Sequence, residues 1–265
     1  MIKLHQADMS SCSQKVRFVL EQKQLSWQSI SVDLHNAENY SPEFKKLNPK
    51  AIIPVLIDGD ELITESNNIC LYLDEKYPQT PLMPSSSKGR SDVRTLLQLI
   101  DEQVHTDSSA ATYAIAFRDR LQSTYDTPEK LEQYLQAMPD AGRRYLKRQL
   151  ITKGMESKEF EIAILRLAAT VNHLDSLLQN SDFLVDDQLS IADIAYSPYI
   201  TRLDHLAMGN LWDQKPAVAE WYERIKQTSG YQQGLSAKFN QDAINNMTTQ
   251  GEQAFEKVQA ILSEA

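Results

Sequence analysis

Residues 9–17 read Met-Ser-Ser-Cys-Ser-Gln-Lys-Val-Arg, and this stretch separates two patterns that define the start of the fold. Before it, the short apolar run 2–6 is bounded by a loop, which predicts a buried strand. After it, apolar residues recur at helical spacing and predict a helix over about 12–23. Three small hydroxyl and thiol side chains therefore lie at the start of the first helix: Ser10, Ser11 and Cys12.

The segments after this helix predict a small sheet. Apolar and polar residues alternate over 27–34, the period-two pattern of a strand, and a right-handed crossover would place it parallel to the first strand. Two apolar runs around an Asp-Gly pair predict a hairpin over 53–64. Pro54 at its start belongs at a strand edge or in a special turn. Ser66 is the expected N-cap of a helix that ends near Tyr77.

Residues 79–89 are rich in proline and serine and end in a glycine, which predicts a linker between two domains. No strand pattern follows it. Helical patterns begin near Val93 and recur at about 129–150, 157–179, 190–204, 215–228 and 236–262. Ser190 and Asp193 form an expected capping box with aspartate in place of glutamate. We expect an α/β domain over 1–78 followed by an all-α helical bundle domain over 90–265.

The composition argues against several classes of protein. The net charge of −9 and the pI near 5.1 oppose a nucleic-acid partner, because phosphate neutralisation needs a basic surface. No apolar stretch reaches roughly 18 residues, and the N-terminus lacks the regions of a signal peptide, which predicts a soluble cytoplasmic protein with no membrane contact. The two cysteines, Cys12 and Cys70, have no metal-ligand spacing, so neither a metal site nor a disulfide framework is expected.

Four motifs together resemble those of the cytosolic glutathione transferase family. Residues 9–17 resemble the Ser-Ser-Cys motif of zeta-class transferases, the maleylacetoacetate isomerases, and equally that of the tetrachlorohydroquinone reductive dehalogenases. Residues 47–56 resemble the family's Asn-Pro to Val-Pro-x-Leu segment, 65–69 its Glu-Ser-x-x-Ile motif, and 190–193 its second-domain capping box. The resemblance implies a thioredoxin-like glutathione-binding domain, an all-α substrate-binding domain, glutathione as co-substrate and a homodimer.

The resemblance also assigns the first-domain motifs to parts of glutathione. Glu65 and Ser66 would hold the γ-glutamyl end, where free N–H groups at a helix start favour an anion. A surface acid and a plain helix cap are the simpler interpretations of these two residues. Pro54 corresponds to the family's cis-proline, which would direct the backbone of Ile53 toward the cysteinyl part.

The chain departs from the family's pattern in two places. Many relatives carry lysine or glutamine just before the Val-Pro dipeptide, where these residues help to hold glutathione, whereas this chain has Ala51 and Ile52. Lys50, one position earlier, is the candidate substitute for glutathione binding. It also has extra helical material over about 120–160, which includes the basic run 143–148. The extra material could extend the substrate cleft or dock an acidic partner, and a solvated helix face is the plainer interpretation of the basic run.

Ser10, Ser11 and Cys12 offer two chemistries. A hydroxyl donor would stabilise the thiolate of glutathione: lowering a thiol pKa from about 8.5 to about 6.5 needs ~2.7 kcal/mol, which a charged hydrogen bond and a helix terminus supply. The zeta-class resemblance implies Ser10 as the leading donor and Ser11 as the next, with helix capping as the rival role. Cys12 could instead attack a glutathionyl adduct and leave a mixed disulfide, as the dehalogenase resemblance implies. Cys70 is expected to be a buried structural cysteine.

The electrophile is expected between the domains. His105, Ser109 and Tyr113 recur there at i, i+4 and i+8 and share one helix face, although core packing or a solvated stripe would give the same spacing. We therefore predict a glutathione transferase that attacks a small hydrophobic electrophile, with reductive dehalogenation and cis-trans isomerisation of a maleyl-type substrate as variants. The alternative is a transferase-like binding or scaffold protein without catalysis.

Overall fold

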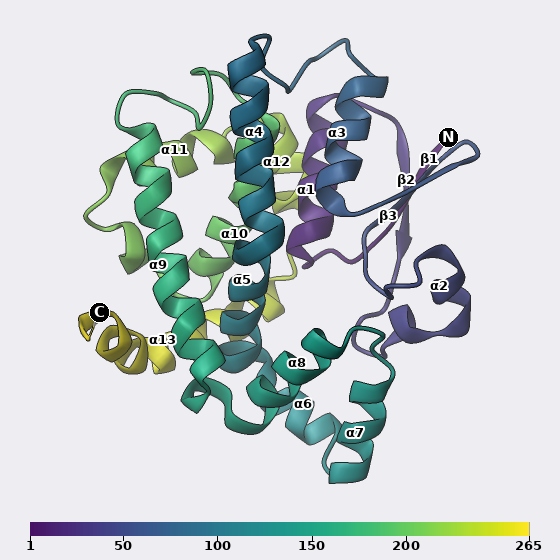
Figure 1. The fold of residues 1–265 in the computed structure, drawn as a ribbon, viewed down its shortest axis with the longest axis vertical. Coiled ribbons are helices and arrows are strands. Elements are labelled where there is room, and N and C mark those ends of the chain that lie inside the picture. The colour runs from purple at the N-terminus through teal and green to yellow at the C-terminus, as the bar shows by residue number, and fades with distance from the viewer. Residues whose placement is uncertain (265) are drawn as a thin grey trace.

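The computed structural model describes residues 1–264 and contains a small sheet domain followed by a helical domain, as predicted (Figure 1). Four strands form one sheet in the order β2-β1-β3-β4: β1 (Ile2–Gln6), β2 (Trp27–Ser31), β3 (Val55–Asp58) and β4 (Glu61–Thr64). β1 is parallel to β2 and antiparallel to β3, and β3 is antiparallel to β4. The helical elements of this domain are α1 (Ser11–Gln22), η1 (Glu38–Tyr40), α2 (Pro42–Leu47) and α3 (Ser66–Lys76).

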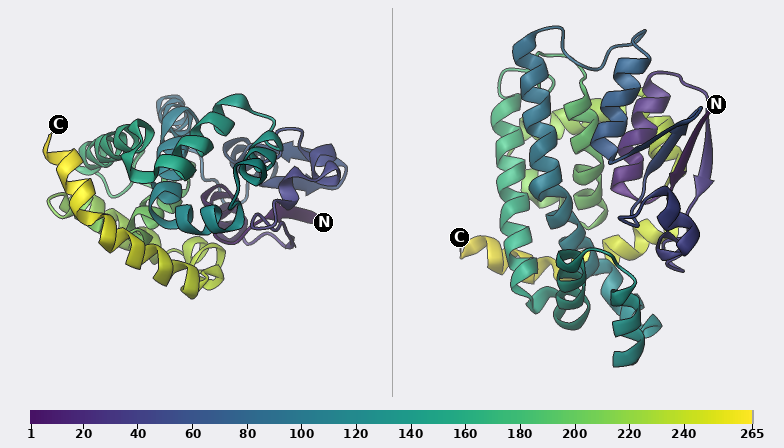
Figure 2. Two further views of the ribbon diagram at one scale, coloured as in Figure 1. Left: turned by 90° about the horizontal axis from the view of Figure 1, so that it is seen from below. Right: turned by 45° about the vertical axis from the view of Figure 1, so that its right-hand side comes forward.

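The second domain begins with one long helix that π-helical turns interrupt twice. Its segments are α4 (Ser87–Leu99), η2 (Ile100–Val104), α5 (His105–Thr112), η3 (Tyr113–Phe117) and α6 (Arg118–Thr124). The remaining elements are α7 (Pro128–Gln136), α8 (Ala141–Lys153), η4 (Gly154–Glu156), α9 (Lys158–Leu178), α10 (Ile191–His205), η5 (Gly209–Trp212), α11 (Pro216–Lys226), α12 (Ser229–Gly234), η6 (Ser236–Lys238) and α13 (Gln241–Ser263). Figure 2 shows α13, in yellow, crossing the bundle near its lower end.

The structure corrects the predicted helix over 129–150. This segment forms two helices, because Pro139 cannot continue α7 and disfavours a helical conformation at the residue before it. Asp140 then caps α8, and its side chain accepts a hydrogen bond from the backbone N–H of Arg143 at 2.6 Å. The insert is therefore a helical hairpin that turns back toward the first domain, below α2 in Figure 1.

Two element boundaries and one cap position also differ from the predictions. The strand predicted over 27–34 ends at Ser31, and α4 begins at Ser87, inside the predicted linker. Ser66 is the first residue of α3 rather than its cap, and Glu65 holds the cap position at φ 66°. The predicted capping box of α10 is confirmed, since the Ser190 hydroxyl accepts from the backbone and the aspartate three residues on accepts from the Ser190 N–H.

Helix α1 is the element that joins the two domains. It packs against α3 in the first domain and against α10 and α12 in the second. Arg17, which is fully buried, donates from Nε to the carbonyl of Gly234 at 2.6 Å and from Nη2 to the carbonyl of Asp8 at 2.8 Å. The start of α1, where the three small side chains lie, is therefore fixed by contacts from both domains.

Replacing Gly234 with alanine is expected to destabilise the protein by about 1–3 kcal/mol, the usual cost of overpacking. A Cβ at this position would lie 2.9 Å from the backbone carbon of Arg17, and neither backbone is free to move aside. Urea unfolding of the variant measures the loss. Gly142→Ala, whose Cβ meets only the Asp140 side chain at 3.4 Å, is the matched control. A variant as stable as the wild type would show that the close packing of α12 against α1 at Gly234 does not contribute to stability.

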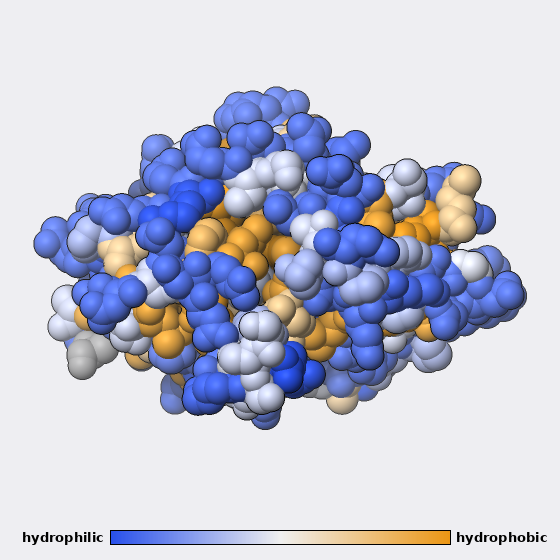
Figure 3. Space-filling model, turned by 90° about the horizontal axis from the view of Figure 1, so that it is seen from above, coloured by the Kyte–Doolittle hydropathy of each residue, from blue (hydrophilic) through white to orange (hydrophobic). Residues whose placement is uncertain are grey.

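The surface is mostly polar. Figure 3 shows polar side chains over most of the face seen from above, with apolar ones gathered near its centre. Within residues 1–264, no helix is long and apolar enough to cross a membrane. In the same part of the chain, no three residues among histidine, cysteine, aspartate and glutamate are grouped in a way that would hold a metal ion.

Candidate active site

Cys12 meets two side chains of the second domain at the start of α1. Its Sγ lies 3.4 Å from Nδ1 of His105 on α5 and 3.8 Å from the hydroxyl of Tyr199 on α10. The Tyr199 hydroxyl also lies 3.3 Å from His105 Nδ1, so the three groups form a closed triangle. Cys12 is a free cysteine and is half-buried as a residue. The geometry therefore places a free thiol beside an imidazole at a helix N-terminus.

This environment favours the thiolate form of Cys12. Burial by itself raises the pKa of the thiol, but the charges of His105 and Lys15 and hydrogen bonds from His105 and Ser66 outweigh it, and the pKa falls from 9.0 to about 6. Most Cys12 side chains are then ionised at neutral pH, which makes this thiol a strong nucleophile. Cys70 differs: it is fully buried in α3, and burial raises the pKa of its thiol to about 12.

The alkylation of Cys12 by iodoacetamide is expected to follow a single titration with a midpoint near pH 6, because only the thiolate reacts. Replacing His105 with glutamine removes the imidazole that lowers the pKa of Cys12 and keeps the side chain polar, so the midpoint is expected to rise by at least about one unit, or ~1.4 kcal/mol. Peptide mass spectrometry against pH measures both curves. An unchanged midpoint in His105→Gln would show that the imidazole does not stabilise the thiolate.

A buried lysine supports the same site. Lys15 is fully buried on α1, and its Nζ lies 5.3 Å from the centre of the Tyr199 ring. Nζ donates to Oδ1 of Asn67 on α3 at 2.9 Å. The Asn67 amide in turn donates to Asp101 Oδ1 at 2.9 Å and to the Leu97 carbonyl at 3.1 Å. This chain of polar contacts joins α1, α3 and the long helix of the second domain, and it holds a positive charge near Cys12.

Sequence reasoning did not single out Lys15, Asn67 or Tyr199. Lys15 follows Cys12 by three residues, so helical spacing alone places it on the same side of α1. Asn67 follows the predicted glutathione-binding Ser66 directly. Tyr199 gives no comparable signal, because 187 positions separate it from Cys12.

The two serines of the motif differ in their surroundings. The Ser10 hydroxyl accepts a hydrogen bond from the Ser13 N–H at 3.3 Å and caps α1, which is the rival role that the sequence indicated. Ser11 is the first residue of the helix and is half-buried. An accepting hydroxyl keeps its own proton to donate, so capping and thiolate stabilisation are compatible for Ser10.

The predicted glutathione residues lie together at the edge of the first domain. The Ile53–Pro54 peptide bond is cis. Lys50 Nζ forms an exposed ion pair with Glu65 Oε1 at 2.7 Å, directly before the N-terminus of α3, where Ser66 is buried. Free N–H groups and a lysine therefore meet at one helix start, which is an arrangement that favours a carboxylate.

The three predicted residues of the electrophile site do not converge on one point. His105 contacts Cys12, as described. Ser109 is half-buried on the regular part of α5. Tyr113 begins the π turn η3, about 12 Å further along the helix from His105. Its ring stacks edge-on against Phe117 at 5.3 Å and lies under the ammonium group of Lys147.

The basic run of α8 is only partly a solvated helix face, because its four cations are half-buried. Arg148 pairs with Glu132 at 2.7 Å. Arg144 Nη1 donates to the Met138 carbonyl at 2.6 Å, and Lys147 covers Tyr113. Arg143 donates to the carbonyl of Lys50 in the first domain at 3.3 Å. Arg143 thus reaches the first domain, and Lys147 covers a ring of η3.

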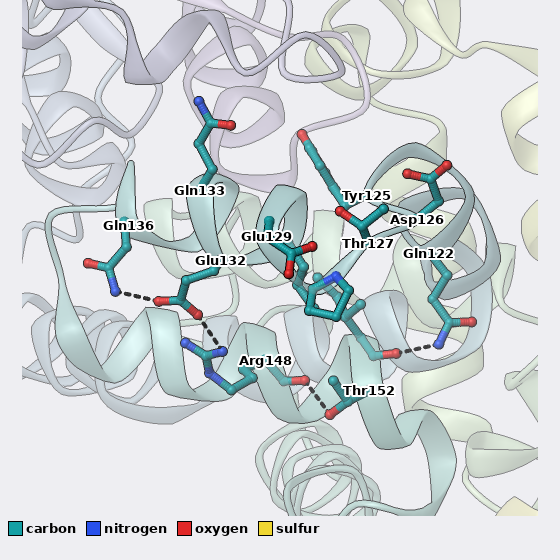
Figure 4. A pocket seen from close by; sticks show the side chains of 13 residues that line it. Gln122, Tyr125, Asp126, Thr127, Glu129, Glu132, Gln133, Gln136, Arg148 and Thr152 are labelled. Atoms are coloured by element: carbon teal, nitrogen blue, oxygen red, sulfur yellow. Dashed lines mark hydrogen bonds and ion pairs between the residues drawn. The ribbon is translucent and has the colours of Figure 1, made fainter.

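Two open hollows lie beside the insert. The larger one has about 980 Å³ and lies between α6, α7 and α8, where Figure 4 shows Glu132 between Gln136 and Arg148. It contains neither cysteine nor histidine. The smaller one has about 500 Å³ and lies between residues 36–41 of the first domain and 124–137 of the insert, with the rings of Tyr40, Tyr125 and Tyr134 in its wall.

Comparison with family models gives two matches. The model described as "Glutathione S-transferase, N-terminal domain" matches residues 4–81, and "Glutathione S-transferase, C-terminal domain" matches residues 156–224. Together they cover more than half of the chain. The helices α4 to α8 lie between the two matched ranges.

Individual proteins show the same similarity. A zeta-class glutathione S-transferase of Euphorbia esula is 42% identical over 32% of this chain, and the chain spans only 37–41% of the length of this and three further plant glutathione S-transferases. The tetrachloro-p-hydroquinone reductive dehalogenase of Sphingobium chlorophenolicum is 26% identical over 85% of this chain and 92% of its own length. The crystal structure of the beta-etherase LigF from Sphingobium sp. strain SYK-6 has a TM-score of 0.80 at 24% identity, covers 88% of this chain and 98% of its own, and shows the same fold.

Proposed function

Because this chain belongs to the glutathione S-transferase family, we propose that it is a glutathione-dependent enzyme in which Cys12 is the reactive thiol of the protein. The observation that carries the proposal is the contact of the Cys12 thiol with His105 at the N-terminus of α1. A structural cysteine gains nothing from a lowered pKa, whereas a nucleophile needs it. The relative named a reductive dehalogenase gives this chemistry a precedent.

In the proposed reaction, glutathione first displaces a leaving group from an activated carbon and forms a thioether. The Cys12 thiolate then attacks the sulfur of that thioether. The carbon–sulfur bond breaks, the carbon keeps the electron pair and takes a proton, and Cys12 and glutathione form a mixed disulfide. A second glutathione thiolate attacks this disulfide, restores Cys12 and releases glutathione disulfide. The carbon is thus reduced by two electrons, which two glutathione thiols supply.

Glutathione would lie along the first domain. Glu65 and Ser66 at the start of α3 would hold the γ-glutamyl end, together with Lys50, and the backbone of Ile53 before Pro54 would meet the cysteinyl part. Ser10 or Ser11 would donate to the glutathione thiolate during the first step. Homodimer formation and a cytoplasmic location belong to the same proposal and rest on the family alone, and light scattering tests the first of them.

Simple glutathione transfer and maleyl-type isomerisation use only the attack of the glutathione thiolate on a substrate carbon. Both need a stabilised glutathione thiolate and no protein thiol. The contact between Cys12 and His105 therefore favours the reductive variant.

Calorimetric titration with reduced glutathione at neutral pH tests the binding site. Saturable binding is expected for the wild type and at least about tenfold weaker binding for Ser66→Ala, since a hydrogen bond to a charged group contributes about 1.5–3 kcal/mol. Ser157→Ala removes the cap of α9 in the second domain and serves as the matched control. Absence of binding to the wild type would favour the scaffold alternative and would indicate that Ala51 and Ile52 have disabled the site.

A further inference from the structure

Three cations of the insert contact η3 or the first domain. Lys147 on α8 places its ammonium group over the ring of Tyr113. Arg143, one helical turn earlier, is held by the carbonyl of Lys50 at 3.3 Å. Arg120 on α6 contacts His35 of the first domain. These side chains come from two helices, and Lys147 and Arg120 cover the two aromatic rings of η3.

Aromatic rings lie in the same part of the insert. The Arg120 guanidinium lies 5.1 Å from the centre of the Phe117 ring. The rings of Tyr125 and Tyr134 stack at 4.2 Å, and Tyr40 meets Tyr134 edge-on at 6.1 Å. The three tyrosine rings form part of the wall of the 500 Å³ hollow between the insert and the first domain. Walls of this kind fit a flat aromatic ligand, because aromatic rings stack on one another with ring centres about 4.5–7 Å apart.

The cations lack a matching negative charge. In the part of the chain that the structure describes, no carboxylate forms an ion pair with Arg120, Arg143 or Lys147. By contrast, Arg148 on the same helix and Lys130 on α7 each pair with an acid. Burial and the nearby Arg143 and Arg120 hold the pKa of Lys147 well below its ordinary value. Like charges gathered without a counter-charge repel one another, and a bound anion would relieve this repulsion.

We propose that Arg143, Lys147 and Arg120 bind the carboxylate of an aromatic electrophile, so that the substrate class is an aromatic acid. This inference rests on the proposed function, because the reacting carbon of the substrate would lie beside glutathione and Cys12. Tyr113, beneath Lys147, lies about 12 Å along the helix from His105 at the reactive thiol. This separation matches the length of one substituted aromatic ring with a polar contact at each end. The insert, which lies between the two ranges that the family models match, thereby supplies the selectivity for an aromatic acid.

Direct binding without glutathione tests the site independently of catalysis. Calorimetry compares 3,5-dinitrobenzoate with its neutral analogue 3,5-dinitrobenzamide. The wild type is expected to bind the acid at least tenfold more tightly, and the double variant Arg143→Gln/Lys147→Met is expected to lose this preference. Arg144→Gln/Arg148→Gln on the same helix is the matched control and should keep it. Arg120→Gln provides a second test on another helix and should reduce the preference severalfold.

Turnover with glutathione completes the test. The ratio of kcat/KM for 4-chloro-3,5-dinitrobenzoate to that for the corresponding benzamide is expected to fall tenfold in the double variant and to stay unchanged in the control. A wild type that binds acid and amide equally would overturn the proposal. So would a double variant that keeps the preference but binds glutathione tenfold more weakly, because the cations would then hold glutathione itself. Selective binding of the acid without turnover would contradict the proposed function and leave this site intact.

Discussion

Replacing Cys12 with serine is expected to slow reductive removal of glutathione from its adduct by about a thousandfold or more, the scale at which enzymes lose activity without their nucleophile. A serine hydroxyl stays protonated at neutral pH, whereas the Cys12 thiol has a pKa of about 6. The first step, attack of glutathione on the halogenated carbon, does not use this thiol. Single-turnover chromatography with a chlorinated dihydroxybenzoate, which combines the hydroquinone ring with the proposed carboxylate, is therefore expected to show the glutathionyl adduct accumulating in the variant.

Two further variants make this result specific. Cys70→Ala removes the other cysteine, which is buried in the core of the first domain, and should leave the rate of the second step within a fewfold of the wild type. Ser10→Ala and Ser11→Ala should slow the first step instead, since their hydroxyls would act on the glutathione thiolate. A Cys12→Ser enzyme that converts the adduct at the wild-type rate would contradict the role of the thiol.

Replacing Asp193 with alanine is expected to cost about 3–5 kcal/mol of stability, because it leaves several buried donors unpaired at about 1–3 kcal/mol each. The carboxylate is fully buried. Oδ2 accepts from the N–H and hydroxyl of Ser190 at 2.8 and 2.7 Å, and Oδ1 accepts from the Leu184 N–H and from Trp221 Nε1, both at 2.9 Å. Alanine would leave all four donors without this acceptor inside the core.

Urea unfolding at neutral pH measures this loss. Ser190→Ala is the matched comparison, and it is expected to cost only about 1 kcal/mol, as for other helix caps. The larger effect at Asp193 reflects its extra role, because it joins the start of α10 to α11 and to the preceding loop. Equal losses in the two variants would show that Asp193 acts only as part of the cap.

The order of elements could be predicted from the sequence because each pattern is local. The strand of 2–6, the helix after it and the Asp-Gly hairpin each depend on neighbouring residues, and the structure confirms them. The predicted helix over 129–150 was wrong because its periodicity continues across Pro139, where the backbone cannot stay helical. Periodicity measures which residues face the core, and two helices in succession can bury residues with nearly the same spacing.

The candidate site could be predicted only in part, because its contacts join distant segments. The motif at 9–17 identified Cys12, and helical spacing selected His105, but nothing in either segment indicates that the two meet. Tyr199 depends on the packing of α10 against α1, which only the assembled core determines. The partners of the basic run could not be predicted for the same reason, since the hairpin of α7 and α8 had to turn back before Arg143 could reach Lys50.

The most direct test of the central claim is the intact mass of the protein, quenched with acid during turnover of a chlorinated dihydroxybenzoate. Glutathione is supplied at one equivalent per substrate, so that no second glutathione is left to resolve the mixed disulfide. We predict a mass increase of one glutathionyl group on the wild type, located on the peptide that contains Cys12, reversed by excess glutathione and absent from Cys12→Ser. Turnover to the reduced product with no adduct on Cys12 at any quench time would contradict the account.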